Sequence, residues 1–240
     1  MLLDPYHTAS GELCAVSAEQ GHQFAKGVAE DFNPLHDADN SRFCVPGDLL
    51  FALVLMRQGL SQSVRFHFEG MAGADMPMRI PTLAMPEFSL IAGDKVLAQV
   101  TRAGALNRNQ AVIEQLVCHY VRFSGRNFPH ILVPLMEQHE LMINPDRPLV
   151  IYEGMSFELD SLERSDLELV LLGSRLEIAG KRAKAHLDFE WRVGAQPVGR
   201  GAKTLVLGGL RPLEPAGLQG LVERYDGWRA SYLATRPHAP

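Results

Sequence analysis

The stretch Pro46-Gly-Asp-Leu-Leu-Phe-Ala-Leu-Val-Leu-Met-Arg-Gln-Gly59 is apolar on almost every face that a helix would present. It opens with Pro-Gly-Asp, and Gly59 is placed to end a helix. A helix at a protein surface keeps one polar face, whereas a helix that is apolar all round must be covered on every side. The stretch therefore predicts a buried helix, of the kind that a sheet wraps around.

Segments with strand character follow this helix. Residues 63–69 alternate apolar and polar side chains with period two. Further apolar segments, separated by Pro, Gly, Asp or Asn, lie at 82–91, 95–102 and 110–123. Short turns between such segments are typical of antiparallel hairpins. We therefore expect one helix followed by several antiparallel strands.

The same order recurs in the second half of the chain. Residues 129–142 are a second helix candidate, and Pro134 in its first turns delays its start. Four segments rich in Val, Leu, Ile or aromatic residues follow at 149–159, 167–178, 183–193 and 197–207. The run Glu87-Phe-Ser-Leu90 has a weak echo in Ser156-Phe-Glu-Leu159, which favours two copies of one α+β unit.

One central apolar helix with a curled antiparallel sheet is typical of the hotdog fold. The expected fold class is therefore α+β, a double hotdog, with tandem units at residues 1–125 and 126–240. An amphipathic helix over 213–234 and a frayed tail at 236–240 complete the second unit. Two hotdogs in one chain can already form a pseudo-dimer, so a monomer or a homodimer is expected.

Composition restricts the classes of function. The formal net charge is -5, so no basic surplus is available to neutralise a nucleic-acid backbone. Three widely spaced cysteines form neither a CxxC pair nor a disulfide framework, which fits a reducing compartment. The N-terminus has no apolar signal-peptide core, and the longest apolar run is too short to cross a bilayer. A cytoplasmic protein that binds neither nucleic acid nor membrane is expected.

The segment Asp31-Phe-Asn-Pro-Leu-His36 is the sharpest motif of the sequence. Asn33-Pro34 makes a turn, and Pro34 restricts the residue before it to extended conformations. This turn can bring the Asp31 carboxylate and the His36 imidazole into one small volume. Such a pair can deprotonate a water molecule and deliver a proton, because the imidazole titrates near neutral pH.

The motif resembles that of MaoC-like, (R)-specific enoyl-CoA hydratases. In that family Asp-x-Asn-Pro-x-His precedes an acidic segment, a Phe and a Gly that opens the central helix, here Phe43 and Gly47. The resemblance implies that Asp31 and His36 are the catalytic pair that activates water for addition to a trans-2-enoyl thioester. It implies that the backbone of Gly47 binds the thioester oxygen and that Asn33 supports the loop. The implied ligand is an acyl-CoA or acyl-carrier thioester, with no metal and no cofactor.

The sequence also departs from the family pattern. Pro46 stands where the family has His before the helix-opening Gly, and the segment from Phe43 to Gly47 is about two residues shorter. Residues 125–130, before the second helix, lack a counterpart of the motif Asp. An acyl-CoA thioesterase and a non-catalytic acyl-CoA or acyl-carrier binding protein therefore remain alternatives, since fold alone does not determine function.

Each candidate residue also has a plain structural interpretation. The motif can be an ordinary turn at a helix entry, and Gly47 can serve only a tight turn. Cys44 lies close to the motif, but without a matched base it is expected to be a small buried apolar side chain. The remaining histidines show no metal-binding spacing. Geometry decides: a hydratase needs Asp31 and His36 to face a cavity at a helix N-terminus, whereas a cavity filled by Phe32 or Phe51 favours a binding or structural role.

Overall fold

A computed structural model describes residues 1–163 and 166–235 of the chain. The tail predicted at 236–240 lies outside the described residues. The helical elements are η1 (Asp4–Tyr6), α1 (Ala18–Phe24), η2 (Ala25–Ala29), η3 (Pro34–His36), α2 (Gly47–Gln58), α3 (Gln110–Gly125), η4 (Phe128–Leu132), α4 (Val133–Gln138) and α5 (Pro215–Thr235). Among the described residues, no helix has both the length and the apolar character that a bilayer-spanning helix needs.

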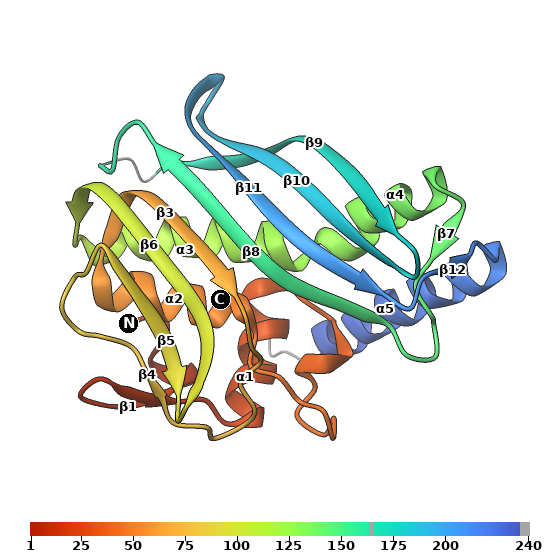
Figure 1. Cartoon of the computed structure of the whole chain (residues 1–240), viewed down its shortest axis with the longest axis horizontal. Helices are drawn as coiled ribbons and strands as arrows, with labels where there is room; N and C mark the ends of the chain where they lie inside the picture. Colours follow the sequence, from red (N-terminus) through yellow and green to blue (C-terminus); the bar gives the residue numbers. More distant parts are fainter. Residues whose placement is uncertain (164–165, 236–240) are drawn as a thin grey trace.

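Ten strands form one antiparallel sheet in the order β1-β2-β4-β5-β6-β3-β8-β11-β10-β9 (Figure 1). These strands are β1 (Thr8–Ser10), β2 (Leu13–Ala15), β3 (Leu60–Phe68), β4 (Met78–Arg79), β5 (Glu87–Ala92), β6 (Lys95–Asn107), β8 (Leu149–Leu159), β9 (Glu168–Ala179), β10 (Arg182–Val193) and β11 (Gln196–Gly208). A separate small sheet pairs β7 (Leu141–Met142) with β12 (Arg211–Pro212).

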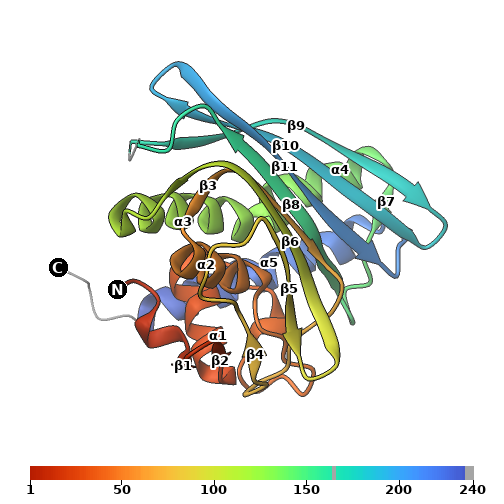
Figure 2. The same ribbon diagram turned by 60° about the vertical axis from the view of Figure 1, so that its left-hand side comes forward.

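The two halves of the chain join edge to edge at the centre of the large sheet. Strand β3 pairs with β8 in antiparallel register, with Val64 opposite Phe157 and Phe66 opposite Met155. Each half contributes helices followed by strands, and Figure 2 shows the sheet arching over α2, α3 and α5. The fold is therefore an α+β double hotdog, as predicted, while the division of the chain between residues 125 and 126 stays a prediction.

Helix α2 is buried on all sides, as its sequence predicts. Nine of its twelve residues are buried, including Leu49, Phe51 and Leu55 at 0 % exposure. Phe51 packs against Phe66 of the sheet and against Tyr120 of α3. The backbone carbonyl groups at its C-terminal end, where Gln58 is 0 % exposed, must therefore find partners inside the protein.

The C-terminal end of α2 is capped by a buried arginine from β6. The Arg102 guanidinium donates hydrogen bonds to the carbonyl oxygens of Gln58 at 3.2 Å and Gly59 at 2.9 Å, and to the Ser61 hydroxyl at 2.7 Å. A cation at a helix C-terminus also opposes the negative end of the helix dipole. Arg102 is only 7 % exposed, so these bonds replace its hydration.

The segment at 110–123 was predicted as a strand, and this prediction is wrong, because it lies in helix α3. Its buried residues Ile113, Leu116, Val117 and Tyr120 recur at helical spacing. The Asn109 side chain caps the helix by accepting from the N–H of Ala111. The 3.6-residue periodicity of the apolar side chains outweighs the strand preference of Val, Ile and Tyr, because a helix can bury this whole face at once.

The other predicted boundaries need smaller corrections. The helix predicted at 129–142 ends at Gln138, since Glu140 adopts a left-handed φ of 52°. The strand predicted at 82–91 begins only at Glu87, because the Gln58 side chain binds the N–H of Met85 at 3.1 Å and holds the preceding residues in a loop. The sequence echo between residues 87–90 and 156–159 matches β5 with β8. In the sheet, however, β8 lies beside β3 at the junction of the two halves, so β3 is the strand of the first half that occupies the corresponding position.

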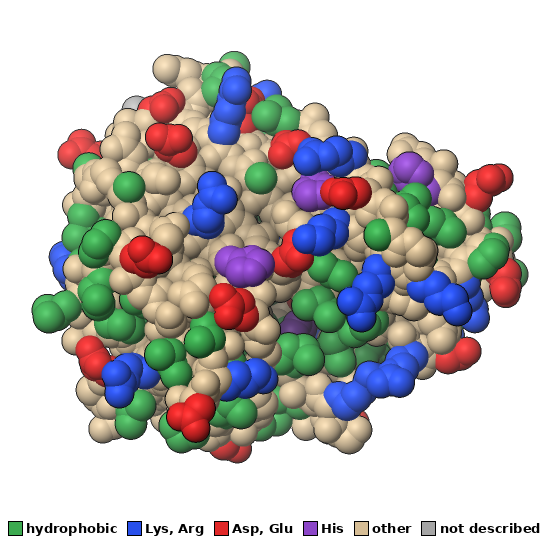
Figure 3. Space-filling model, viewed as in Figure 1, with side chains coloured by type: hydrophobic (Ala, Val, Ile, Leu, Met, Phe, Trp, Pro, Cys, Tyr) green, Lys and Arg blue, Asp and Glu red, His purple; other side chains and the backbone are tan. Residues whose placement is uncertain are grey.

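The outer face of the second half of the sheet is polar. Ion pairs connect strands there, with Arg175 of β9 bound to Asp188 of β10 at 3.3 Å and Lys184 of β10 bound across β11 to Glu153 of β8 at 2.8 Å. Figure 3 shows acidic and basic side chains interspersed over this face, with apolar side chains gathered at the lower right. The buried apolar side chains of the sheet face the helices, whereas Leu171, Leu172 and Ile178 of the edge strand β9 are exposed.

We expect Arg102→Met to lower the free energy of unfolding by about 3 kcal/mol, because it leaves the last carbonyls of α2 buried without donors. Urea unfolding followed by circular dichroism measures the change. The matched control is Arg108→Met, an exposed arginine just beyond the end of β6, with an expected change below about 0.5 kcal/mol. Equal effects of both variants would contradict a specific capping role for Arg102.

Candidate active site

A cavity of about 420 Å³ lies between the motif loop, the N-terminus of α2 and the second half of the chain. Its polar lining includes Asp31, His36, Asp48, Ser124, Asn127 and Lys203. One lobe of it is apolar, lined by Leu132, Ile143, Val150, Leu205 and Leu221. A volume of this size accommodates a small-molecule ligand. The two predicted catalytic residues and Gly47 all lie on this lining.

The entry into the motif loop depends on a close approach of two backbones. Helix η2 ends at Glu30, which adopts a left-handed φ of 57° and turns the chain toward Asp31. Gly125 lies against this turn, and a Cβ placed there would be 2.0 Å from the Ala29 carbonyl oxygen. The Tyr225 hydroxyl of α5 donates to the carbonyl oxygens of Gly125 and Glu30, at 3.2 and 3.3 Å. The C-terminal end of α3 and the middle of α5 therefore fix where Asp31 stands.

Two side-chain turns shape the loop itself. The Asp31 Oδ1 accepts a hydrogen bond from the N–H of Asn33 at 2.8 Å, and the Asn33 Oδ1 accepts one from the N–H of Leu35 at 3.1 Å. The second bond caps the short helix η3, which begins at Pro34. Such bonds are typical of Asp and Asn at turns. They orient the Asp31 carboxylate so that its other oxygen faces His36.

A buried lysine of η2 binds the motif loop. The Lys26 ammonium binds Asp37 at 2.9 Å and the carbonyl oxygen of Asn33 at 3.2 Å, and it lies 5.3 Å from the centre of the Phe32 ring. Lys26 is only 5 % exposed. These contacts connect both ends of the Asn33–Asp37 turn to η2, so the motif is anchored independently of any ligand.

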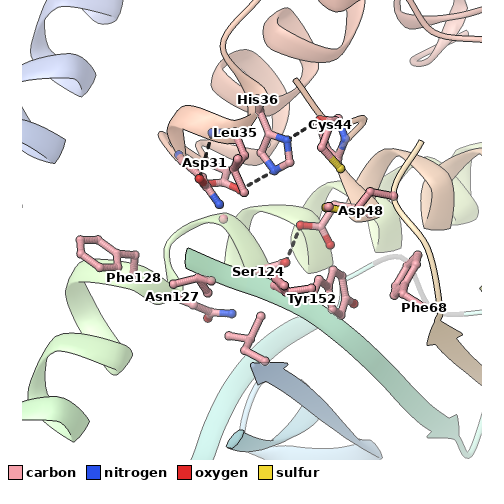
Figure 4. Close-up of a pocket in the computed structure, with 18 of the residues that line it drawn as sticks. Asp31, Leu35, His36, Cys44, Asp48, Phe68, Ser124, Asn127, Phe128 and Tyr152 are labelled. Atoms are coloured by element: carbon pink, nitrogen blue, oxygen red, sulfur yellow. Dashed lines mark hydrogen bonds and ion pairs between the residues drawn. The ribbon is translucent and has the colours of Figure 1, made fainter. Parts of the chain in front are cut away.

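Asp31 and His36 meet at the cavity wall. The Asp31 Oδ2 lies 3.5 Å from the His36 Nε2, and the side chains are 21 % and 12 % exposed. The His36 Nδ1 is 2.7 Å from the carbonyl oxygen of Cys44, which can only accept, so Nδ1 carries the proton of that bond. In the neutral ring Nε2 is then an acceptor, and a single water molecule can donate to both Nε2 and Oδ2 (Figure 4).

The N-terminus of α2 is directed at the same cavity. Its N-cap residue, Pro46, provides no side-chain hydrogen bond, so the first N–H groups, those of Gly47 and Asp48, remain available to a ligand. A Cβ on Gly47 would lie 2.9 Å from the Tyr152 ring and 3.3 Å from the Phe68 ring. Gly47 is thus required by close packing beside the cavity, and its role as the oxyanion position stays a prediction.

A buried ionic cluster faces the Asp31–His36 pair from the other side of the cavity. The Ser124 hydroxyl donates to the Asp48 carboxylate at 2.5 Å and accepts a short hydrogen bond from the Lys203 ammonium. Lys203 also lies 4.2 Å from the centre of the Tyr152 ring, a cation–π contact. The Tyr152 hydroxyl in turn shares a short hydrogen bond with that of Tyr120.

Burial acts on both charges of this cluster. It raises the pKa of Asp48 and lowers the pKa of Lys203, because removal from water disfavours each ionised form. The opposite charge of the partner counteracts each shift, since Lys203 favours ionised Asp48 and Asp48 favours protonated Lys203. Asp31 also raises the pKa of Asp48, so the two carboxylates influence each other across the cavity.

The sequence analysis did not identify Asp48, Ser124, Asn127 or Lys203 as site residues. A signal existed for Lys203, because it alternates in phase with the inward-facing Leu205 and Leu207 of β11, where a charge is unexpected. Ser124 directly follows the segment 110–123 that is wrongly predicted as a strand, so its position on a helix cannot be recognised. Asp48 was interpreted only as part of the helix opening.

The rings of Phe32 and Phe51 lie outside the cavity lining. Phe32 packs against Tyr225 at 5.7 Å between ring centres, and Phe51 packs in the core, so neither ring fills the cavity. Cys44 lines the cavity and is half-buried, and burial raises the pKa of its thiol to about 11. Within the described part of the chain, no cluster of three His, Cys, Asp or Glu side chains could hold a metal ion.

We expect Lys203→Met to lower the free energy of unfolding by about 3–5 kcal/mol, because it leaves Asp48 buried without its counter-charge. The double variant Lys203→Met/Asp48→Asn should recover a large part of this loss, since it removes both charges. The control Lys184→Met changes an exposed lysine of β10, the strand next to that of Lys203, and removes its ion pair with Glu153. It should lower the free energy of unfolding by less than about 1 kcal/mol. Chemical denaturation measures all three, and additive single and double effects would contradict the coupling.

Comparisons with solved structures return distant hotdog proteins. The tesB protein of Mycobacterium avium subspecies paratuberculosis shares 8% identity over 85% of this chain and 96% of its own, with a TM-score of 0.48. The acyl-CoA thioesterase II TesB2 of Mycobacterium marinum shares 9% identity over 90% and 99%, with a TM-score of 0.42. A conserved protein with a hot dog fold from Alicyclobacillus acidocaldarius shares 8% identity over 89% and 99%, with a TM-score of 0.44.

A search of curated protein sequences finds no match. A comparison with protein families matches the family described as "Protein of unknown function (DUF3581)" over residues 1–216, which is most of the chain. The protein therefore belongs to the DUF3581 family.

Proposed function

We propose that the protein acts on acyl thioesters and uses Asp31 and His36 to activate water for addition to a trans-2-enoyl thioester. The observation that carries the proposal is the position of the pair, with Oδ2 and Nε2 3.5 Å apart on the wall of a cavity at the N-terminus of α2. An acid–base pair and the electropositive N-terminus of a helix then lie around one cavity of substrate size.

The proposed reaction begins with a water molecule that donates to both Asp31 and His36. Its lone pairs then face the substrate, and Asp31 removes a proton as the oxygen bonds to C3. The electrons of the double bond move toward the thioester oxygen, where the N–H groups of Gly47 and Asp48 and the helix dipole stabilise the developing charge. A proton returned from the Asp31–His36 pair to C2 completes the addition and restores both groups.

The rest of the cavity provides room for the acyl chain. Its apolar lobe is formed by side chains of η4, β8, β11 and α5, including Leu132, Val150 and Leu221. Burial of an alkyl chain there contributes about 0.8 kcal/mol for each methylene group. In this arrangement the first half supplies the water-activating pair and the second half binds the chain.

Hydrolysis of the thioester is the second candidate reaction. The same water molecule could attack the carbonyl carbon, with the same helix N-terminus polarising the oxygen. This activity is the one named for the Mycobacterium marinum structure. A non-catalytic binding protein is the third candidate, which gives the Asp31–His36 pair no chemical role.

We expect purified protein to consume a trans-2-enoyl-CoA, followed by the loss of its ultraviolet absorbance, and Asp31→Asn to lower the rate by about 10²–10⁴-fold. His36→Gln should have an effect of similar size, because Gln keeps no acid–base function. The matched control is Asp39→Asn, an exposed acidic residue of the same loop, which should keep the wild-type rate.

A thiol-reactive chromophore in a parallel assay separates the two reactions. Enoyl loss without free CoA supports hydration, whereas release of CoA that depends on Asp31 replaces hydration with hydrolysis. The absence of both signals, with short and medium chains alike, would rule out both enzymatic candidates for CoA thioesters and leave a binding role.

Cys44 should not take part in the chemistry although it lines the cavity. Its thiol, with a pKa raised to about 11, is protonated at neutral pH and bonds the carbonyl oxygen of Val45 at 3.4 Å. We expect Cys44→Ala to retain the wild-type rate within about threefold, since His36 binds only the backbone of Cys44. Loss of activity together with a trapped acyl-cysteine would contradict this assignment.

A further inference from the structure

Three polar atoms in the cavity have no hydrogen-bond partner among the described residues. They are both amide atoms of Asn127 and the Oδ1 of Asp48. Asn127 is 3 % exposed and Asp48 is 6 % exposed, so bulk water does not satisfy them freely. Buried polar groups are almost always paired in native proteins, and several unpaired atoms around one cavity indicate a ligand that pairs with them.

The position of Asn127 leaves its amide little freedom. It directly follows the C-terminus of α3, where Gly125 is bound by Tyr225 and Arg126 binds Glu30 at 2.7 Å. Figure 4 shows Asn127 on the same side of the cavity as Ser124 and Tyr152, across from Asp31 and His36. These contacts fix the backbone on which Asn127 stands, and its buried amide lines the cavity.

A plain hydrocarbon chain would leave these atoms unsatisfied. The lobe beyond them is lined by apolar side chains such as Leu132 and Leu205, which need no polar partner. A site that hydrogen-bonds a ligand group discriminates strongly against the analogue that lacks it, because its buried polar atoms then lose their bonds to water without replacement. The cavity thus favours an acyl group that carries a polar substituent.

The charges of the site determine which kind of substituent fits. Asp48 Oδ1 can only accept a hydrogen bond when ionised, whereas the Asn127 amide can both donate and accept. A carboxylate would be repelled by Asp48 and Asp31, and the Lys203 ammonium is already engaged with Ser124 and the Tyr152 ring. A neutral group that both donates and accepts matches the open atoms best.

We propose that the acyl part of the ligand carries a hydroxyl group that is bound by Asn127 and Asp48. This inference rests on the proposed function, because it takes the ligand to be an acyl thioester. It assigns Asn127 and Asp48 as specificity-determining residues, in addition to the water-activating pair.

Binding of non-reactive thioethers tests the proposal without any turnover. The probes are S-hexyl-CoA, the four S-hydroxyhexyl-CoA isomers with the hydroxyl at carbons 3 to 6, and S-(5-carboxypentyl)-CoA, each titrated by calorimetry. We expect at least one hydroxyl isomer to bind wild-type protein about tenfold more tightly than S-hexyl-CoA, and the carboxylate to bind more weakly than that isomer.

The variant Asn127→Leu should reduce this preference to about twofold or less while S-hexyl-CoA still binds, which a general loss of folding would not produce. The control Gln219→Leu replaces an exposed amide of α5 that does not line the cavity, and it should keep the preference.

Each other outcome overturns the proposal in a distinct way. If S-hexyl-CoA binds as tightly as every hydroxyl isomer, the claim of a polar substituent is overturned, whereas the proposed acyl-thioester function still stands. Tightest binding of the carboxylate overturns its neutral character. No binding of any thioether overturns both this proposal and the proposed acyl-thioester function.

Discussion

The complete burial of α2 is the constraint on which the rest of the structure depends. A helix without a polar face needs cover on all sides, and a curled sheet with α3 behind it supplies that cover. Its backbone ends must then be satisfied internally. Arg102 does this at the C-terminus, whereas at the N-terminus Pro46 gives no cap and the free N–H groups face a cavity. The same burial that forms the core therefore leaves the electropositive N-terminus of α2 beside the motif loop.

Much of this could be predicted from the sequence because the signals are local. The apolar stretch at 46–59 defines a buried helix, and the strands at 149–159, 183–193 and 197–207 agree with β8, β10 and β11. Asp31 and His36 could be identified because a turn of six residues brings them together regardless of the rest of the fold. Short-range turn chemistry, through Asn33 and Pro34, is enough to place that pair.

The residues that could not be predicted depend on contacts between distant segments. Ser124 and Lys203 are separated by 79 positions and meet only because α3 passes beneath β11. Gly125 looks like an ordinary helix end, yet its role is to admit the Ala29 carbonyl. The incorrect prediction of a strand at 110–123 also prevents the helix end at Ser124 and Gly125 from being recognised. Val, Ile and Tyr suit strands in isolation, but the six buried apolar residues of α3 favour a helix because they pack against α2.

The ionic cluster and the catalytic pair belong to one electrostatic unit in the proposed reaction. Asp48 stands in the first turn of α2, where a lone carboxylate would oppose negative charge developing on a thioester oxygen. Lys203 offsets this charge through Ser124, so the N–H groups of Gly47 and Asp48 can still stabilise that oxygen. Asp31 then faces a carboxylate whose charge Lys203 offsets in part, rather than an isolated second anion. On this argument the buried pair is retained less for stability, which an apolar pair could supply, than for keeping the helix N-terminus positive.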